Sequence, residues 1–172
     1  MNNKINKKQI ILDTNFLLLP FTLKIDIFSE INKIVFFPYE FVVLEQSIDE
    51  LNKIASNKNE KGKDREAAKL AIKLIKQKQE KNELKIINFI KDKQKTLYKA
   101  INSRNLLVDD IILMLASSQE DKEIKEIQDK KKIRENFIVA TNDAILKKKL
   151  KNLGIKIIYL KKKKVMEMQN VL

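Results

Sequence analysis

Short apolar runs that end at a polar residue alternate along this chain with longer segments of helical periodicity. The runs are QIIL before Asp13, FVVL before Glu45 and FIVA before Thr141. Each run is too short for a helix, and its unbroken apolar character is typical of a strand buried on both faces of a parallel sheet. The segments between the runs supply crossover connections, which are right-handed in such sheets. The alternation therefore predicts an α/β fold built on a parallel sheet.

The expected elements follow from this pattern. We expect strands at residues 9–12, 40–44, 85–90, 137–140 and 155–160. We expect helices at residues 21–35, from Gln46 or Ser47 to Ala55, at 64–80, at 108–118 and at 143–153.

The connections between these elements give weaker signals. Residues 57–63 are expected to be a loop, residues 92–105 a loop with some helix, and residues 120–132 a charged helix or lid. Asn15 and Asn142 are expected to cap the helices that follow them, and Gly154 to end the last helix.

Missing residue types limit the chemistry. The chain has no cysteine and no histidine. This excludes disulfides, thiol nucleophiles, histidine-based triads and zinc sites built on sulfur or imidazole. Any metal must be held by oxygen, which favours Mg²⁺ or Mn²⁺. There is no apolar run near the ~20 residues that cross a bilayer, and no signal peptide opens the chain. We therefore expect a cytoplasmic protein with no membrane partner.

Acidic residues stand in four places that the predicted topology brings together. Asp13 and Asp143 follow strands, Glu50 lies about one turn into a helix after a strand, and Asp109 and Asp110 start a buried helix. The ligand site of a parallel sheet lies outside the carboxyl ends of its strands. An unpaired carboxylate at the edge of a core is costly, and a divalent cation is one way to offset that cost. Taken singly, Asp13, Asp143 and the pair Asp109-Asp110 can be explained as helix caps, and Glu50 as a solvated helix residue.

The charge balance predicts a polyanionic partner. The chain has 36 Lys and Arg against 23 Asp and Glu, a net charge of +13. Residues 144–165 contain nine lysines and no acid, whereas a solvated helix face normally mixes both signs. We favour a surface that faces nucleic acid over an ordinary basic surface. The candidate RNA-binding residues are Lys147, Lys148, Lys151, Lys161 and Lys162.

Four short motifs give the sequence a family resemblance. LDTNFLL, ELNKIA, VDDIIL and VATND occur in the order in which similar motifs occur in the PIN-domain nucleases. GKDREAAKLAIKLIK and LKKKLKNLGIKIIYLKKKK extend the resemblance. It is strongest to archaeal PIN proteins related to the eukaryotic small-subunit rRNA-processing endonuclease, which share the doubled aspartate. The expected organisation is a flexible basic N-terminus at residues 1–8, a PIN domain at 9–165 and a C-terminal tail at 166–172.

The resemblance implies a fold, an activity and partners. The fold is a three-layer α/β/α sandwich around a parallel sheet of order 3-2-1-4-5. The activity is hydrolysis of single-stranded RNA with one or two Mg²⁺ or Mn²⁺ ions. The implied partners are RNA, such as pre-rRNA, and a second copy of the chain or ribosome-assembly factors. Two alternatives remain: a VapC-type toxin ribonuclease, and an RNA-binding PIN module that does not cleave.

The resemblance also assigns site residues. Asp13 matches the first acid, and Asp143 matches the acid of the TND element, whose turn Thr141 and Asn142 shape. For the second acid, the match to the ELNKIA motif favours Glu50, while Glu45 is the acid that directly follows the strand. Asp109 is matched before Asp110, and both are candidate ligands. The implied catalytic acids are Asp13, Glu50, Asp109 and Asp143, with Asp110 added as a metal ligand and Asn15, Thr141 and Asn142 in support.

Overall fold

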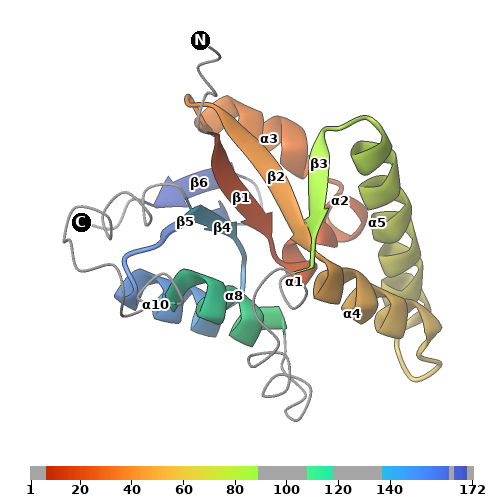
Figure 1. Ribbon diagram of the computed structural model, residues 1–172. Helices are drawn as coiled ribbons and strands as arrows, with labels where there is room; N and C mark the ends of the chain where they lie inside the picture. The colour runs from red at the N-terminus through yellow and green to blue at the C-terminus, as the bar shows by residue number, and fades with distance from the viewer. Residues whose placement is uncertain (1–6, 89–107, 118–136, 163–164, 170–172) are drawn as a thin grey trace.

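The computed structural model describes residues 7–88, 108–117, 137–162 and 165–169, which form an α/β fold around one sheet (Figure 1). The sheet has the order β3-β2-β1-β4-β5-β6. The first five strands run parallel, and β6 runs antiparallel to β5. The predicted order 3-2-1-4-5 is confirmed. The strands are β1 Lys8–Leu12, β2 Tyr39–Leu44, β3 Leu84–Ile87, β4 Phe137–Ala140, β5 Lys156–Lys161 and β6 Val165–Gln169.

The central strands are apolar on both faces because helices cover both sides of the sheet. On β1, Ile10 and Leu12 pack into one hydrophobic cluster, while Ile11 packs into the other. All four residues of β4 are buried. Successive side chains of a strand point to opposite faces, so each of these strands contributes to two cores.

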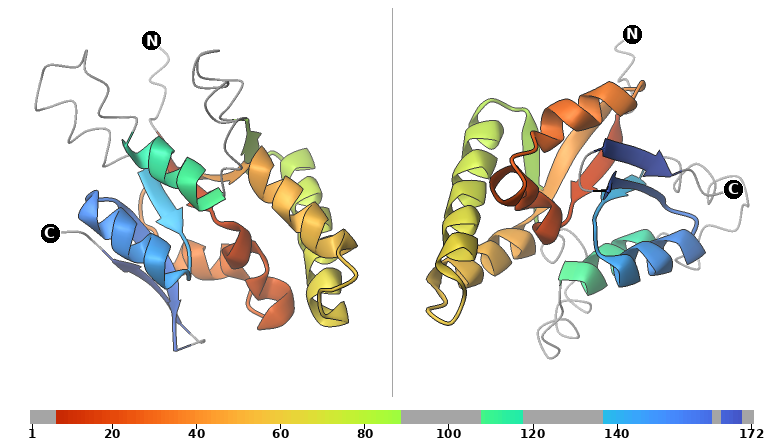
Figure 2. Two further views of the ribbon diagram at one scale, coloured as in Figure 1. Left: turned by 90° about the horizontal axis from the view of Figure 1, so that it is seen from below. Right: turned by 180° about the vertical axis from the view of Figure 1, so that it is seen from behind.

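Two groups of helices form the outer layers (Figure 2). Helices α8 and α10 pack side by side and cover the face of Ile11. The N-terminal helices contribute to the cluster on the other face. They are α1 Thr14–Leu17, α2 Leu19–Thr22, α3 Ile27–Ile34, α4 Glu45–Ser56 and α5 Gly62–Glu80, while α8 spans Val108–Ser117 and α10 spans Ala144–Asn152.

The predicted helix at residues 21–35 is wrong in its extent. Instead of one helix, the chain forms α2, which ends at Thr22, and α3, which begins at Ile27. Between them Lys24 has a left-handed backbone with φ of 57°, which interrupts the helical conformation. Asp26 then starts α3, since its side chain accepts hydrogen bonds from the N–H groups of Phe28 and Ser29, both at 3.1 Å. The apolar period continues through the break, so periodicity alone did not reveal it.

Strand β6 was not predicted, because no helix separates it from β5 and the alternation of strands and helices stops there. Met166 of β6 is 2% exposed and belongs to the core. Glu167 accepts a hydrogen bond from the hydroxyl of Tyr159 at 2.8 Å and pairs with Lys161 at 2.7 Å. These contacts join β6 to β5 and put the turn with Lys162 at the carboxyl end of β5.

The predictions for residues 92–105 and 120–132 lie outside the described residues. Within the described residues, no helix combines the length and the apolarity needed to span a membrane.

Candidate functional site at the carboxyl edge of the sheet

The strand register brings the polar residues that follow β1 and β4 to one edge. Leu12 pairs with Ala140 across the two strands. The N–H of Asp13 donates to the carbonyl of Ala140 at 3.0 Å, and the N–H of Thr141 donates to the carbonyl of Ile158 at 2.9 Å. Asp13 and Thr141 therefore leave their strands side by side.

Asp13 is a buried acid whose side chain does not cap a helix. It stands at the start of α1, but its carboxylate makes no capping hydrogen bond to that helix. Instead, Oδ2 accepts a hydrogen bond from the hydroxyl of Thr141 at 2.8 Å. The side chain is 2% exposed, and burial raises the pKa of Asp13 to about 7, with the nearby charges of Asp109 and Glu50 acting in the same direction.

The segment from Thr141 to Asp143 ties two of the acids to the sheet. The Thr141 hydroxyl donates to Asp13 and also accepts from the backbone N–H of Asp143 at 3.1 Å. Asp143 caps α10, because its Oδ1 accepts from the N–H of Leu146 at 2.6 Å. The expectation that Asn142 is this cap is wrong. Its Oδ1 accepts from the N–H of Leu160 at 2.8 Å and so fastens the turn to β5.

The two glutamates that compete for the second acid have different partners. The Oε2 atom of Glu50 accepts a hydrogen bond of 2.7 Å from the hydroxyl of Thr14, the residue next to Asp13. Glu45 instead accepts from the side-chain amide of Asn88, at the end of β3. Glu50 therefore lies with the other acids and Glu45 lies toward the edge strand.

Asp109 couples the helix α8 to this group. Burial raises the pKa of the half-buried Asp109, and the charges of Asp143, Glu50 and Asp110 raise it further, while Lys149 acts in the opposite direction. Asp109 also acts on Asp13. Electrostatic interactions thus link the four predicted catalytic acids, two of which lie in the helices α4 and α8 and two in the turns after β1 and β4. Asp110 lies beside Asp109 in the first turn of α8.

Asn15 has no visible part in this group. It lies within α1 rather than before it, so it does not cap the helix, and its side chain is exposed. Thr14 was missed by the sequence reasoning, although it is buried and holds Glu50. The hydroxyl directly after the first acid could have marked Thr14 as a site residue. No sequence pattern, however, predicts that its hydrogen-bond partner lies 36 positions away.

The chemistry of this edge suits a hard cation. Within the described part of the chain, Asp13, Glu50, Asp109 and Asp143 form no ion pair with a lysine or arginine. Their donor atoms are all oxygen, as Mg²⁺ and Mn²⁺ prefer. However, no three acids of the described residues are grouped tightly enough to hold one ion. Binding of one ion by three of these acids would therefore require their side chains to draw together.

The predicted RNA-binding lysines fall into two kinds. Lys147 lies over the ring of Tyr159 at 5.0 Å, and Lys161 is paired with Glu167. Lys148, Lys151 and Lys162 are exposed. Lysines of α10 follow Asp143 along the chain, and those of the β5–β6 turn stand at the carboxyl end of β5. Both sets therefore flank the edge that holds the acids.

Comparisons with known proteins agree with this arrangement. A family model described as "PIN like domain" matches residues 10–163. Ribonuclease VapC4 of Methanocaldococcus jannaschii is 30% identical over 159 residues, which are 92% of this chain and 95% of that protein. The solved structure of the PIN domain endonuclease Utp24 superposes with a TM-score of 0.62 at 16% identity, covering 95% of this chain and 92% of that one. At that identity the structural likeness bears on the fold alone.

Proposed function

Because this chain belongs to the PIN-like domain family, we propose that it is a Mg²⁺- or Mn²⁺-dependent endoribonuclease of single-stranded RNA that acts in ribosomal RNA processing. PIN domain nucleases are hydrolases that cleave RNA, and they generally use divalent metal ions. The observation that carries the proposal is the gathering of Asp13, Glu50, Asp109 and Asp143 at one edge of the sheet.

The acids and their threonine partners have distinct tasks in this mechanism. Asp13, Glu50, Asp109 and Asp143 would hold the ion, with Asp110 beside them. A bound ion lowers the pKa of a coordinated water and offsets charge on the scissile phosphate. Thr141 sets Asp13 relative to the Asp143 backbone, since its hydroxyl contacts both. This hydrogen bond would orient the Asp13 carboxylate toward the ion.

The lysines beside this edge would bind the RNA backbone. Lys148, Lys149 and Lys151 are exposed on the helix that Asp143 opens. Lys161 and Lys162 stand at the β5–β6 turn. Lysine contacts to phosphates orient a strand without reading its sequence. Specificity for one RNA would then come from RNA shape or from a partner, such as a second copy or a ribosome-assembly factor.

A toxin role is the second candidate, and the relative named Ribonuclease VapC4 favours it. The rRNA role is supported by the doubled aspartate, the VATND wording and the fold shared with Utp24. Incubating total RNA with the protein and Mn²⁺ and mapping the cut ends separates the two. Cuts at the boundary of a mature rRNA support processing, while cuts within mature tRNA or rRNA that stop translation support a toxin.

Cleavage is expected to require a divalent ion. An all-oxygen acidic edge without histidine or cysteine favours a metal-bound water as the nucleophile at neutral pH. Activity on a labelled single-stranded RNA should vanish in excess EDTA and return when Mg²⁺ or Mn²⁺ exceeds the chelator. Undiminished cleavage in EDTA would show that the carboxylates work without a metal, and the proposed mechanism would be wrong.

A further inference from the structure

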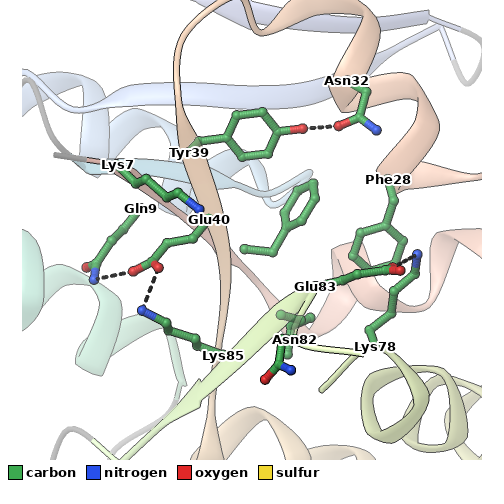
Figure 3. A pocket seen from close by; sticks show the side chains of 12 residues that line it. Lys7, Gln9, Phe28, Asn32, Tyr39, Glu40, Lys78, Asn82, Glu83 and Lys85 are labelled. Atoms are coloured by element: carbon green, nitrogen blue, oxygen red, sulfur yellow. Dashed lines mark hydrogen bonds and ion pairs between the residues drawn. The ribbon is translucent and has the colours of Figure 1, made fainter. Parts of the chain in front are cut away.

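A pocket of about 780 Å³ lies at the amino ends of β1, β2 and β3 (Figure 3). The strands are parallel, so this is the opposite edge of the sheet from the acids. Its walls come from the starts of the three strands, from α3 and from the end of α5. None of the candidate catalytic residues lines it, and the proposed nuclease activity leaves it without a role.

Aromatic rings form the floor of the pocket. The rings of Phe28 and Phe41 meet edge to face with centroids 5.0 Å apart, and Tyr39 meets Phe41 in the same way at 5.1 Å. The hydroxyl of Tyr39 donates to the side chain of Asn32, which holds the tyrosine ring at the wall (Figure 3). Tyr39 is only half-buried, so it can offer a flat apolar surface to a ring of a ligand.

Positive charge exceeds negative charge on both sides of this floor. Glu40 pairs with Lys85 at 2.6 Å and also interacts with Lys7. Glu83 pairs with Lys78 at 2.5 Å and also interacts with Lys81. Each carboxylate thus interacts with two ammonium groups, of which those of Lys7, Lys78 and Lys85 line the pocket and that of Lys81 stands beside it. Positive charge on both sides suits two successive phosphates of a nucleic-acid strand, while a single anion would use only one side.

Amide side chains complete the lining. The amide nitrogen of Gln9 donates to Glu40 at 3.3 Å, and both residues lie on the side of the pocket at the face of the sheet opposite to Tyr39 and Phe41. The side-chain oxygen of Asn32 accepts from Tyr39, and its NH₂ group is a donor that a ligand could use. Amide side chains read the donor and acceptor pattern of base edges. An acidic peptide would use the lysines but would leave both the rings and the amides without a partner.

We propose that this pocket binds one nucleotide of a single-stranded RNA, with the base on the aromatic floor and the flanking phosphates at the two lysine pairs. Stacking on aromatic side chains between lysines is the usual way to hold unpaired nucleotides. The inference rests on the proposed function, because the same RNA would continue to the acidic edge. A strand of five or six residues separates the two sites by roughly 17–20 Å, so only an RNA of several nucleotides contacts both.

The test removes the excess charge and keeps the ion pairs. Lys7→Ala with Lys81→Ala leaves the ion pairs Lys85–Glu40 and Lys78–Glu83 intact, and thermal unfolding of the variant checks that the fold is kept. Lys58→Ala with Lys63→Ala changes the net charge equally at exposed positions away from the pocket. Binding of a fluorescent 15-nucleotide RNA, measured by anisotropy in EDTA across a salt series, gives the slope of log affinity against log salt. The pocket variant should lower this slope by about 1.4, since each lost single-strand phosphate contact contributes about 0.7.

A second pair of variants tests the aromatic floor. Tyr39→Leu should weaken RNA binding by about tenfold, the usual effect of losing one stacked base, while Tyr39→Phe should keep the affinity. Equal salt slopes in the pocket variant and its control would overturn the proposal, as would full competition by polyglutamate. Cleavage with Mn²⁺ is scored separately. RNA that binds through the pocket but is never cut would refute the proposed nuclease function and leave this inference standing.

Discussion

Asp13→Asn should abolish RNA cleavage and stabilise the metal-free protein at the same time. Asparagine keeps the size of the side chain and an oxygen that can accept from the Thr141 hydroxyl. It removes the charge that a metal ligand needs. Loss of a group that only hydrogen-bonds to a metal ligand costs about 10–100-fold, so a direct ligand should cost more than this. Initial rates on a labelled RNA, with saturating Mn²⁺, measure the effect.

The stabilisation has a defined pH dependence. The pKa of Asp13 is raised from 3.8 to about 7, mainly by burial, so the folded protein holds a proton that the unfolded chain has lost. The free energy of unfolding of the wild type therefore falls as pH rises from about 4 to about 7. The variant lacks this fall. Its advantage should grow from nothing below pH 4 to on the order of 4 kcal/mol above pH 7.

Asp49→Asn is the matched control, since Asp49 is an exposed acid on α4. It should change neither cleavage nor the pH dependence of stability. Denaturant unfolding in EDTA at several pH values measures the stabilities. If Asp13→Asn cuts at the wild-type rate, or loses stability at every pH, Asp13 is a structural residue and the site lies elsewhere.

The sheet could be predicted because burial on both faces leaves a strong local signal. FIVA, for example, forms a strand with the predicted bounds 137–140. The break at Lys24 and the strand β6 were not predicted, since the apolar period continues through the break and β6 follows β5 without a helix between them. Met166 enters the core only because β6 pairs with β5. A short C-terminal tail and an edge strand look alike in a single sequence.

The same limit applies to the site. The meeting of Asp13 and Asp143 at one edge follows from parallel topology, because both residues come after adjacent strands. The contact of Thr14 with Glu50 depends on how α4 packs against α1, which no spacing rule gives. The sequence predicts Asn142 as the cap of α10, whereas Asp143 is the cap in the structure. The two could not be distinguished, because either side chain can accept a hydrogen bond from the first turn of a helix.

Glu50→Gln should reduce cleavage far more than Glu45→Gln. Glu50 lies beside Thr14 and acts on Asp13 and Asp109, whereas Glu45 is bound to Asn88 at the end of β3. Both substitutions keep the size of the side chain, and both residues are half-buried on the same helix. A difference in cleavage rate between the two variants therefore reflects only where the two glutamates lie. Side-by-side rates with the same RNA measure it, and the reverse ranking would move the second acid to Glu45.

Thr14 extends this prediction to a positioning residue. Thr14→Val removes the hydroxyl that donates to Glu50 and keeps the shape of the buried side chain. If the hydroxyl serves to orient Glu50, Thr14→Val should weaken Mn²⁺ binding, measured by calorimetry, by about 10–100-fold. Thr14→Ser restores the donor and should restore the affinity. In Glu50→Gln the further change Thr14→Val should then have little additional effect, because two residues that act through one contact are not additive. Additive losses in the double variant would mean that Thr14 supports the fold of α1 and leaves Glu50 to be held by other contacts.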